Sequence, residues 1–600
     1  MDSNPEKSPA DNIDMVTTTP SPSSPHVVLD LPLAKEASVL DHGSDENSDT
    51  ASSDVIRKIP KPHFPIRVFT GEPPPFSLEA QRAIMRWSHE RRHFLPDPYW
   101  LKEPCIDHIK DTVWPYLEQL GADYESIWVE FLAEGGFNRV YTVHTINKVT
   151  NLITDYVFRI ALPVDPYFKT ESEVATTEIV RHFTNIPVPI IYAYDSSTAN
   201  AVGLEWILLE KIVGKKLEET WESLDYETKL RLTKTITSWT VHLSKINSNM
   251  MGNIYMRYTE TDLEFYVGRS VHHVLSQENR LTYDGFRGPF KSLEEYYAAV
   301  LNIADQDVLD LTQAFNSGSF KFEPIPGRPK RKGTFLDQSV FYYLEVDDED
   351  KTDEEWEAEQ RQELKILSTG IKQLRAALPR ICAKAPETSG TLSTYLAHDD
   401  LSRRNIFVDD AGTPVALLDW EALPMKPLLF LTNPPEFIQS YDYEYDEPVL
   451  DSAENEKRYE RLGYSEEEKQ RCRETSAEYY AEKIEEYTCT KLRRVHQEEL
   501  ERIGSPLAKA VWDDYFFLDR QLLKRVVNTS QNVDDLVEWT EAMLAMDEES
   551  EDEEEDEEET NEEGDNNRDG CEYGDKDGDT PQLGFVLHPV TFFEKMGTFG

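Results

Sequence analysis

The order of apolar runs between residues 126 and 214 restricts the fold of this chain more than any other feature of its sequence. Three short runs with strand-like patterning come first, then a helical segment with acidic residues in its first turns, then two further extended runs. In chain order these segments are 126–134, 138–146, 154–162, 168–184, 186–195 and 204–214. Because Pro187 and Pro189 bar a helix from the fifth segment, the pattern predicts a small antiparallel sheet with one helix inserted after its third strand.

Beyond Gly214 the pattern becomes mostly helical. Between residues 224 and 246, apolar side chains recur at alternating spacings of four and three positions, which places them on one face of a helix. Further helices are predicted at 292–306, 353–381, 452–500 and 506–545, and a short strand pair at 405–410 and 414–420. Residues 316–350 mix Pro, Gly and charged residues, which is typical of a loop or insertion. The sequence therefore predicts an α+β fold with a small sheet lobe and a mainly helical lobe.

Composition separates this globular body from its two ends. The chain has 62 Lys and Arg residues against 114 Asp and Glu residues, a formal net charge of −52, and 14 of the 17 residues from Asp547 to Glu563 are acidic. The predicted regions are a disordered N-terminal segment, a linker with a helical extension, the sheet lobe, the helical lobe with an insertion near 307–352, and an acidic disordered tail. Their bounds are 1–60, 61–125, 126–213, 214–545 and 546–600.

The negative charge also limits the partners of the chain. A protein of this charge repels phosphate, which excludes nucleic-acid binding by bulk electrostatics. The acidic tail is interpreted as a solubilising appendage, and capture of a basic protein partner is the functional alternative.

The cysteine spacing, the apolar runs and the N-terminal residues predict where in the cell the protein is located. Five scattered Cys residues without a CxxC pair indicate reduced thiols, and no apolar run is long enough to span a membrane. The first residues have no export signal, and their acidic character argues against a mitochondrial transit peptide. A cytoplasmic protein is expected. A nuclear location stays open because of Arg328, Lys330, Arg331 and Lys332, although a solvated loop is the favoured interpretation of that cluster.

The segment from residue 396 to residue 421 carries the chemistry. Asp400 and Asn405 stand at the two ends of a tight loop before a strand, and Asp419 ends the return strand, which brings it back beside Asn405. His398 can hold the loop by hydrogen bonds. Carboxylate and amide oxygens are ligands suited to Mg²⁺, and phosphoryl transfer needs a carboxylate that accepts the proton of the attacking hydroxyl.

These residues resemble a known family. HDDLSRRNIFV (398–408) followed by ALLDWE (416–421) is similar to HGDLxxxNIxV…IDWE of the aminoglycoside phosphotransferase family, which also contains choline kinases and many fungal members. Three N-terminal segments also resemble family segments: FLAEGGFNRVYTV (131–143), YVFRIAL (156–162) with Glu173, and WILLEKIVG (206–214). RGPF (287–290) and WEALPMKP…NPPEF look like the fungal branch. The matching segments span about residues 126 to 440.

The resemblance implies a protein-kinase-like bilobal fold and a role for each matching residue. Asp400 is expected to be the catalytic base, with His398 in the same loop, and Asn405 and Asp419 are expected to bind Mg²⁺. The residues expected to bind ATP are Gly135, Gly136 and Asn138 in the loop over the phosphates, Arg159 on the phosphates with Glu173 as its partner, and the backbone at Glu210 and Ile212 on the adenine. The implied activity is ATP-dependent phosphorylation of a hydroxyl on a small molecule.

Two departures from the family pattern keep a second function open. Arg159 stands where most kinases have Lys, and Asp399 stands where the family usually has Gly. They motivate the alternative of a pseudokinase or binding scaffold that presents the acidic tail to basic partners. Protein kinase activity ranks lower, because the segment after Asp419 contains no DFG or APE motif. No motif identifies the phosphoryl acceptor.

Overall fold

The computed structural model describes twelve stretches of the chain. They are residues 65–88, 97–258, 263–277, 279–318, 320–324, 331–335, 338–342, 352–384, 392–431, 434–443, 445–450 and 452–510. All of them belong to one unit of the chain, Met1–Thr540. The predictions of a disordered segment at 1–60 and an acidic tail at 546–600, as well as Arg328 and Lys330 of the basic cluster, lie outside the described residues.

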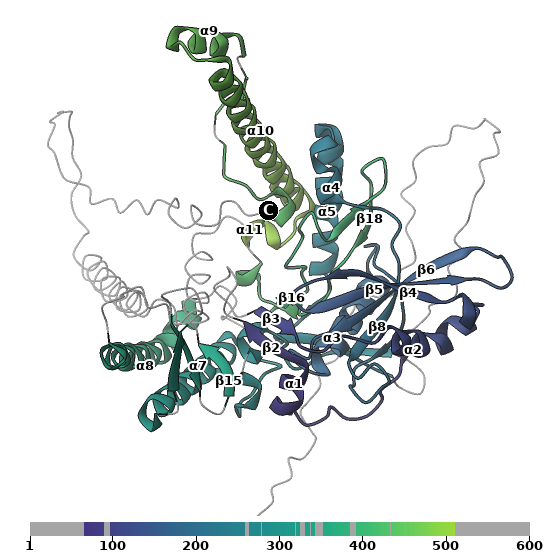
Figure 1. Cartoon of the computed structure of the whole chain (residues 1–600), viewed down its shortest axis with the longest axis vertical. Coiled ribbons are helices and arrows are strands. Elements are labelled where there is room, and N and C mark those ends of the chain that lie inside the picture. Colours follow the sequence, from purple (N-terminus) through teal and green to yellow (C-terminus); the bar gives the residue numbers. More distant parts are fainter. Residues whose placement is uncertain are drawn as a thin grey trace, which may run out of the picture. The chain divides into compact units, whose positions relative to one another are not determined.

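The N-terminal part forms a six-stranded sheet in the order β1-β7-β8-β6-β5-β4 (Figure 1). Five of its strands match the predicted series: β4 (Trp128–Glu134), β5 (Asn138–Ile146), β6 (Ile153–Ala161), β7 (Ile191–Asp195) and β8 (Glu205–Glu210). Helix α3 (Phe168–Phe183) joins the third of these strands to the fourth. The predicted antiparallel sheet with one inserted helix is therefore confirmed.

The sixth strand of this sheet was not expected. The sequence predicts a linker at the start of the 61–125 region, but Ile66–Arg67 forms β1 and pairs in parallel with β7. Arg67 also binds the buried Glu171 of α3, with 2.9 Å between Nη2 and Oε1. The predicted helix after Ser77 ends early, because α1 (Leu78–Ile84) gives way to β2 (Met85–Ser88), which pairs with β3 (Asp97–Trp100).

An apolar core lies between this sheet and helix α2 (Ile106–Gln119). The buried residues of α2 are Ile109, Val113 and Leu117, which recur every fourth position and so share one helix face. They belong to one cluster with Phe158 and Trp206, whose rings stack with centroids 5.2 Å apart. The core holds β6, and therefore Arg159, in a fixed register.

Helices dominate the rest of the described chain. The long ones are α5 (Tyr226–Ser244), α7 (Leu293–Ser317), α8 (Asp353–Lys384), α9 (Ser452–Leu462) and α10 (Glu466–Ile503). The α5 helix begins at Asp225, whose side chain accepts the backbone N–H of Thr228 at 2.8 Å. The α5 and α10 helices are in contact, and so are α7 and α8. No helix among the described residues is both long and apolar enough to cross a membrane.

Short elements complete the described chain. They are β9 (Lys215–Lys216), β10 (Asn247–Ser248), β11 (Gly252–Tyr258), β12 (Leu263–Val267), β13 (Phe320–Pro324), β14 (Arg331–Phe335), β15 (Gln338–Tyr342), β16 (Thr394–Tyr395), β17 (Ile406–Val408), β18 (Pro414–Leu417), β19 (Pro424–Met425), α4 (Leu217–Thr220), α6 (His273–Ser276) and α11 (Leu507–Ala510), with 3₁₀ turns at Tyr124–Ser126, Trp221–Ser223, Arg280–Thr282, Leu428–Phe430 and Glu436–Ile438. Of the two alternatives for 316–350, the irregular loop is wrong, because β13, β14 and β15 form a three-stranded antiparallel sheet there, and the insertion stays a prediction.

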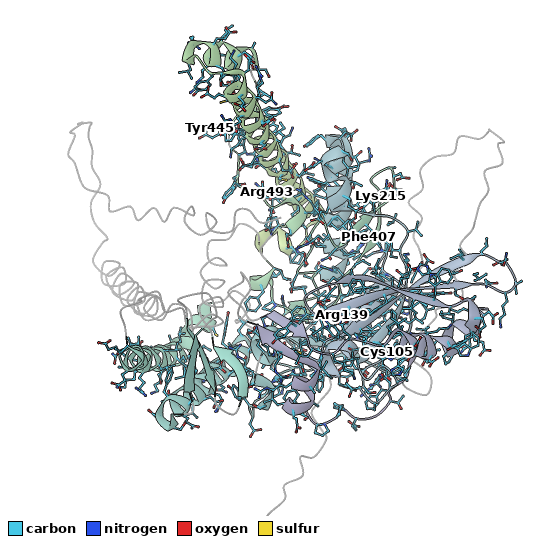
Figure 2. The ribbon with its side chains drawn as sticks, in the orientation of Figure 1. Cys105, Arg139, Lys215, Phe407, Tyr445 and Arg493 are labelled. Atoms are coloured by element: carbon cyan, nitrogen blue, oxygen red, sulfur yellow. The ribbon has the colours of Figure 1, made fainter. Side chains whose placement is uncertain are left out.

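The predicted strand pair around residue 410 is present as β17 and β18. Strand β9 pairs with the edge of β17 opposite β18, and Phe407 pairs with Lys216 there. Figure 2 labels Phe407 and Lys215, which precedes Lys216. The turn between β17 and β18 contains Gly412, with φ of +74°. A Cβ atom there would lie 2.6 Å from Cγ2 of Thr228, so the turn packs against the first turn of α5. This hairpin positions the loop that precedes it.

Candidate functional site

The loop between β16 and β17 carries Asp400 and Asn405. Asn405 ties the loop together, because its side-chain nitrogen donates to the Asp400 carbonyl at 3.1 Å. Its backbone carbonyl accepts the N–H of Leu418 at 2.9 Å. The buried His398 donates from Nε2 to the Leu418 carbonyl at 2.9 Å. The structure therefore brings His398, Asp400 and Asn405 next to the residue that precedes Asp419.

The carboxylate of Asp400 has one oxygen, Oδ1, that is buried and has no hydrogen-bond partner among the described residues. The pKa of Glu436 is raised, mainly by burial and secondly by the charge of Asp400. The two side chains are hydrogen-bonded to each other. Burial also lowers the pKa of His398, which favours the neutral ring that a loop anchor needs. An orphaned carboxylate oxygen is expected of a base that accepts a substrate proton.

Asp419 has an unusual backbone and an unusual acidity. Its φ is +71°, a conformation that few residues other than glycine adopt and that recurs at functional sites. Burial, and then the negative charge of Glu421, raise its pKa to about 7, while Arg159 opposes the rise. A bound cation would favour the charged form of this carboxylate.

The expected pair of Arg159 and Glu173 is present. Arg159 Nη1 lies 2.6 Å from Glu173 Oε1, and Nη2 donates to Oε2 at 2.8 Å, which makes the pair bidentate. Burial alone would lower the pKa of Arg159, but Glu173 and Glu421 raise it above its ordinary value. Both side chains are largely buried, at 14% and 4% exposed. The pair fixes the β6 cation against α3.

Two further charged residues, Lys169 and Glu421, belong to the same cluster, and neither was predicted from the sequence. Glu421 Oε2 lies 2.6 Å from Arg159 Nη2 and 2.6 Å from Lys169 Nζ, and it accepts Asn138 Nδ2 at 2.9 Å. Lys169 Nζ also donates to Asn138 Oδ1 at 3.1 Å. The available signals were the position of Lys169, one helical turn before Glu173, and that of Glu421, two residues after Asp419.

The loop expected to cover phosphates is the turn between β4 and β5. Its ends are joined by the Gly135 N–H, which donates to the Asn138 carbonyl at 2.9 Å. A Cβ atom built on Gly136 would meet nothing within 4 Å. The structure thus leaves open space at this turn, and the role of Gly135 and Gly136 in closing over a ligand stays a prediction.

The expected adenine contacts are only partly available. The backbone N–H of Glu210 donates to the Ile190 carbonyl at 2.8 Å, so this N–H is already used within the fold. Ile212 follows the end of β8, in a short segment without regular structure, and is half-buried. Of the two residues, Ile212 has the backbone better placed to meet a ligand.

The unusual Asp399 has a simple structural partner. It forms an ion pair with Lys426, and its side chain is 39% exposed. Its negative charge is therefore balanced beside the loop rather than directed at Asp400. The Arg403 side chain, in the same loop, donates from Nε to the Phe437 carbonyl at 3.0 Å and also binds Glu485 of α10. Arg403 thus ties the loop to the helical lobe.

The donor set around Asp419 fits a magnesium ion. No group of three or more His, Cys, Asp or Glu side chains that could hold a metal occurs within the described stretches. Mg²⁺ needs no such group, because it is commonly bound by one or two protein oxygens together with substrate phosphates and waters. Asn405 commits its amide nitrogen to Asp400, which leaves its amide oxygen as the group for a cation.

These observations decide the fold. An antiparallel sheet carries a cation paired with a helical Glu, the helix follows the third predicted strand, and a hairpin in the helical lobe carries Asp400, Asn405 and Asp419. The chain has a kinase-like fold. It is the fold that the resemblance to aminoglycoside phosphotransferases and choline kinases implied.

Comparison with solved structures finds members of the same two groups. Aminoglycoside phosphotransferase APH(2'')-Ib, in its ADP-bound form, aligns with 71% of this chain and 98% of its own, at 10% identity and a TM-score of 0.32. Choline kinase from Cryptosporidium parvum aligns with 72% of this chain and 99% of its own, at 12% identity and a TM-score of 0.26. The fold follows from the sheet topology and the site geometry, and these two alignments carry no part of it. No family model matches the chain.

Comparison with curated proteins finds fungal relatives. The chain is 23% identical over 426 residues to "Altered inheritance of mitochondria protein 9, mitochondrial" of Candida glabrata, covering 61% of each chain. It is 38% identical over 95 residues to a subtelomeric hrmA-associated cluster protein of Aspergillus fumigatus, covering 16% of this chain and 18% of that protein. The chain thus spans less than two thirds of the length of these relatives.

The names of these relatives correct one expectation. A cytoplasmic location was predicted, but the Candida glabrata relative is named as a mitochondrial protein, and so is the one from Saccharomyces cerevisiae, at 23% identity over 355 residues. The cytoplasmic prediction is therefore wrong. It depended on the acidic N-terminal residues, which lie outside the described part of the chain.

Proposed function

We propose that the chain is an ATP-dependent phosphotransferase that phosphorylates a hydroxyl group of a small molecule. One observation carries the proposal: the segment with His398, Asp400 and Asn405 is hydrogen-bonded to Leu418, which follows β18 and directly precedes Asp419. A base and two oxygen ligands for a cation therefore lie on neighbouring segments, which is the arrangement that phosphoryl transfer requires.

Each residue has a defined part in this proposal. Asp400 orients the acceptor hydroxyl and accepts its proton at the free carboxylate oxygen. Asn405 and Asp419 would hold Mg²⁺, which supplies charge neutralisation at the phosphates when it is bound. Arg159, fixed by Glu173, would contact the nucleotide phosphates, and the backbone near Ile212 would meet the adenine. His398 holds the loop in place.

Nucleotide binding is the first test. The thermal midpoint of the full chain is measured with and without Mg-ATP, for wild type and for Asp419→Ala. Ligand at 100 times its dissociation constant adds about 2.7 kcal/mol to stability, so a clear rise is expected for wild type and none for the variant. Asp410→Ala is the matched control, because Asp410 lies in the neighbouring turn, where its exposed carboxylate pairs with Lys215. An absence of any rise for wild type at millimolar Mg-ATP would contradict the proposal.

A scaffold function is the second candidate, and one observation favours it. Arg159 already carries two carboxylates, from Glu173 and Glu421, so its charge is compensated without a nucleotide. In that case the acidic tail would serve to capture a basic protein. A screen of hydroxylated metabolites separates the two, because any phosphorylation that disappears in Asp400→Asn supports the enzyme and rules out the scaffold.

We also propose a mitochondrial location, because the relatives that cover half of the chain or more carry that description in their names. Fractionation of cells that express the full-length protein tests this. Recovery with the cytosolic marker alone would contradict it.

A further inference from the structure

One carboxylate oxygen at the candidate site is held by three donors from three different segments. Glu421 Oε2 lies 2.6 Å from the Arg159 guanidinium, 2.6 Å from the Lys169 ammonium and 2.9 Å from the Asn138 amide nitrogen. These residues come from β6, from the first turn of α3 and from the start of β5, whereas Glu421 follows β18. The contact therefore joins the sheet lobe to the hairpin that carries Asp419.

The three donors form a site built for an anionic oxygen. The Lys169 side chain is 3% exposed and that of Glu421 is 12% exposed, so neither charge is shared with bulk water. Burial raises the pKa of a lone carboxyl, yet Lys169 and Arg159 hold the pKa of Glu421 below its ordinary value. Buried charges of this kind need close partners, and each of the four groups depends on the others.

A phosphoryl oxygen has the same requirements as this carboxylate oxygen. It carries negative charge, and it is bound by guanidinium, ammonium and amide donors at the same distances. Arg159 is the cation that the proposed function assigns to the nucleotide phosphates. Lys169 and Asn138 converge on the same point, so any phosphate that reaches Arg159 also meets these two donors.

We propose that Asn138, Arg159 and Lys169 form an anion site for a phosphoryl oxygen of the nucleotide, and that Glu421 occupies this site until the nucleotide displaces it. This inference rests on the proposed function, and it adds Lys169 as a phosphate-binding residue and Glu421 as an internal competitor. Binding then costs the separation of Glu421 from two cations.

The test measures the dissociation constants of inorganic triphosphate and of Mg-ATP for the full chain by calorimetry. Glu421→Gln keeps the shape of the side chain and removes its charge, and we expect it to bind both probes at least about tenfold more tightly than wild type. Lys169→Met keeps the buried stem and removes the donor, and we expect it to bind both at least about tenfold more weakly.

Two matched controls separate this effect from general changes in charge. Glu178 is a buried carboxyl of α3 that accepts the Arg181 Nε–H at 3.1 Å and contacts none of the three donors, so Glu178→Gln should leave both constants unchanged. Lys483 pairs with Glu486 on α10, so Lys483→Met should do the same. Glu421→Asp withdraws the carboxylate by one methylene group, and an intermediate gain is expected if the Gln variant does not fold.

The outcomes distinguish this inference from the proposed function. If wild type binds Mg-ATP and the Glu421 variants bind it equally or more weakly, Glu421 is not a competitor, although the nucleotide site stands. If wild type binds neither probe and Glu421→Gln binds both, the inference is supported. If a folded Glu421 variant and wild type both fail to bind either probe, the inference and the proposed function both fail.

Discussion

The guanidinium carbon of Arg403 lies 4.2 Å from the centre of the Trp221 ring, on which it stacks. Both residues bind Glu485 of α10: Trp221 Nε1 donates to Oε1 at 2.7 Å, and Arg403 pairs with the same oxygen. Because Arg403 is in the loop that carries Asp400, this three-residue contact is the connection between that loop and the longest helix of the described chain.

Arg403→Ala tests how strongly this connection holds the loop. The variant loses a cation–π contact and a partly exposed ion pair, and it leaves Glu485 without its closest cation. We expect the free energy of unfolding to fall by about 1–2 kcal/mol. Arg404→Ala is the control, because the neighbouring Arg404 is 62% exposed and should cost less than about 0.5 kcal/mol. Urea denaturation of both variants measures the difference, and equal losses would contradict the anchor role.

Gly412→Ala tests the packing of the β17–β18 turn. The new Cβ would lie 2.6 Å from Thr228 Cγ2, and the backbone has a φ of +74° that alanine disfavours, so a loss of about 2–4 kcal/mol is expected. Gly318→Ala separates the two causes. Gly318 has a φ of +66° but nothing within 4 Å, and its loss should be only about 1 kcal/mol. Similar losses at the two sites would show that contact with α5 is unimportant.

His496 predicts a pH dependence of stability. It is buried beside Thr237, 2.8 Å from its hydroxyl, and burial lowers its pKa from 6.5 to about 4. Between about pH 4 and pH 6.5, the His496 imidazole is protonated in the unfolded chain and neutral in the folded chain. Stability therefore falls as the pH drops from about 6.5 to 4, by up to about 1.4 kcal/mol per pH unit. Unfolding at pH 7 and pH 5 should show a smaller difference in His496→Gln than in wild type; an equal difference would contradict this.

Substitution of Asp399 is expected to leave the affinity for Mg-ATP nearly unchanged. Its carboxylate is paired with Lys426 and partly exposed, and such pairs contribute about 0–1 kcal/mol. Asp399→Gly, which introduces the residue of the motif that the loop resembles, should leave the Mg-ATP dissociation constant within about twofold of the wild-type value, since the Asp399 charge is already balanced by Lys426. A large gain in affinity would mean that Asp399 does act on the nucleotide site.

Strand patterning was enough to place the sheet lobe. Strands β4, β5 and β6 and helix α3 begin and end within about two residues of the predicted segments. Strand β7 begins at Ile191, five residues after the start of its segment, and β8 ends at Glu210, four residues before the end of its segment. The pairing of Arg159 with Glu173 was implied by the family resemblance, and the structure adds that the pair is bidentate. Patterning failed at 316–350, where Pro, Gly and charged residues indicated a loop but three short strands pair with one another. Strands this short have no periodicity of their own, and their partners in the sheet decide them.

By itself, the sequence determined the order of the elements and the segment that carries Asp400, Asn405 and Asp419, because period and motif are local properties of the chain. Only the tertiary structure decided what surrounds Arg159. Asn138, Lys169 and Glu421 are separated by up to 283 positions, and none of their local patterns indicates a contact. They meet because burying the cations of the sheet lobe requires a carboxylate, and the folded hairpin is what brings Glu421 to them.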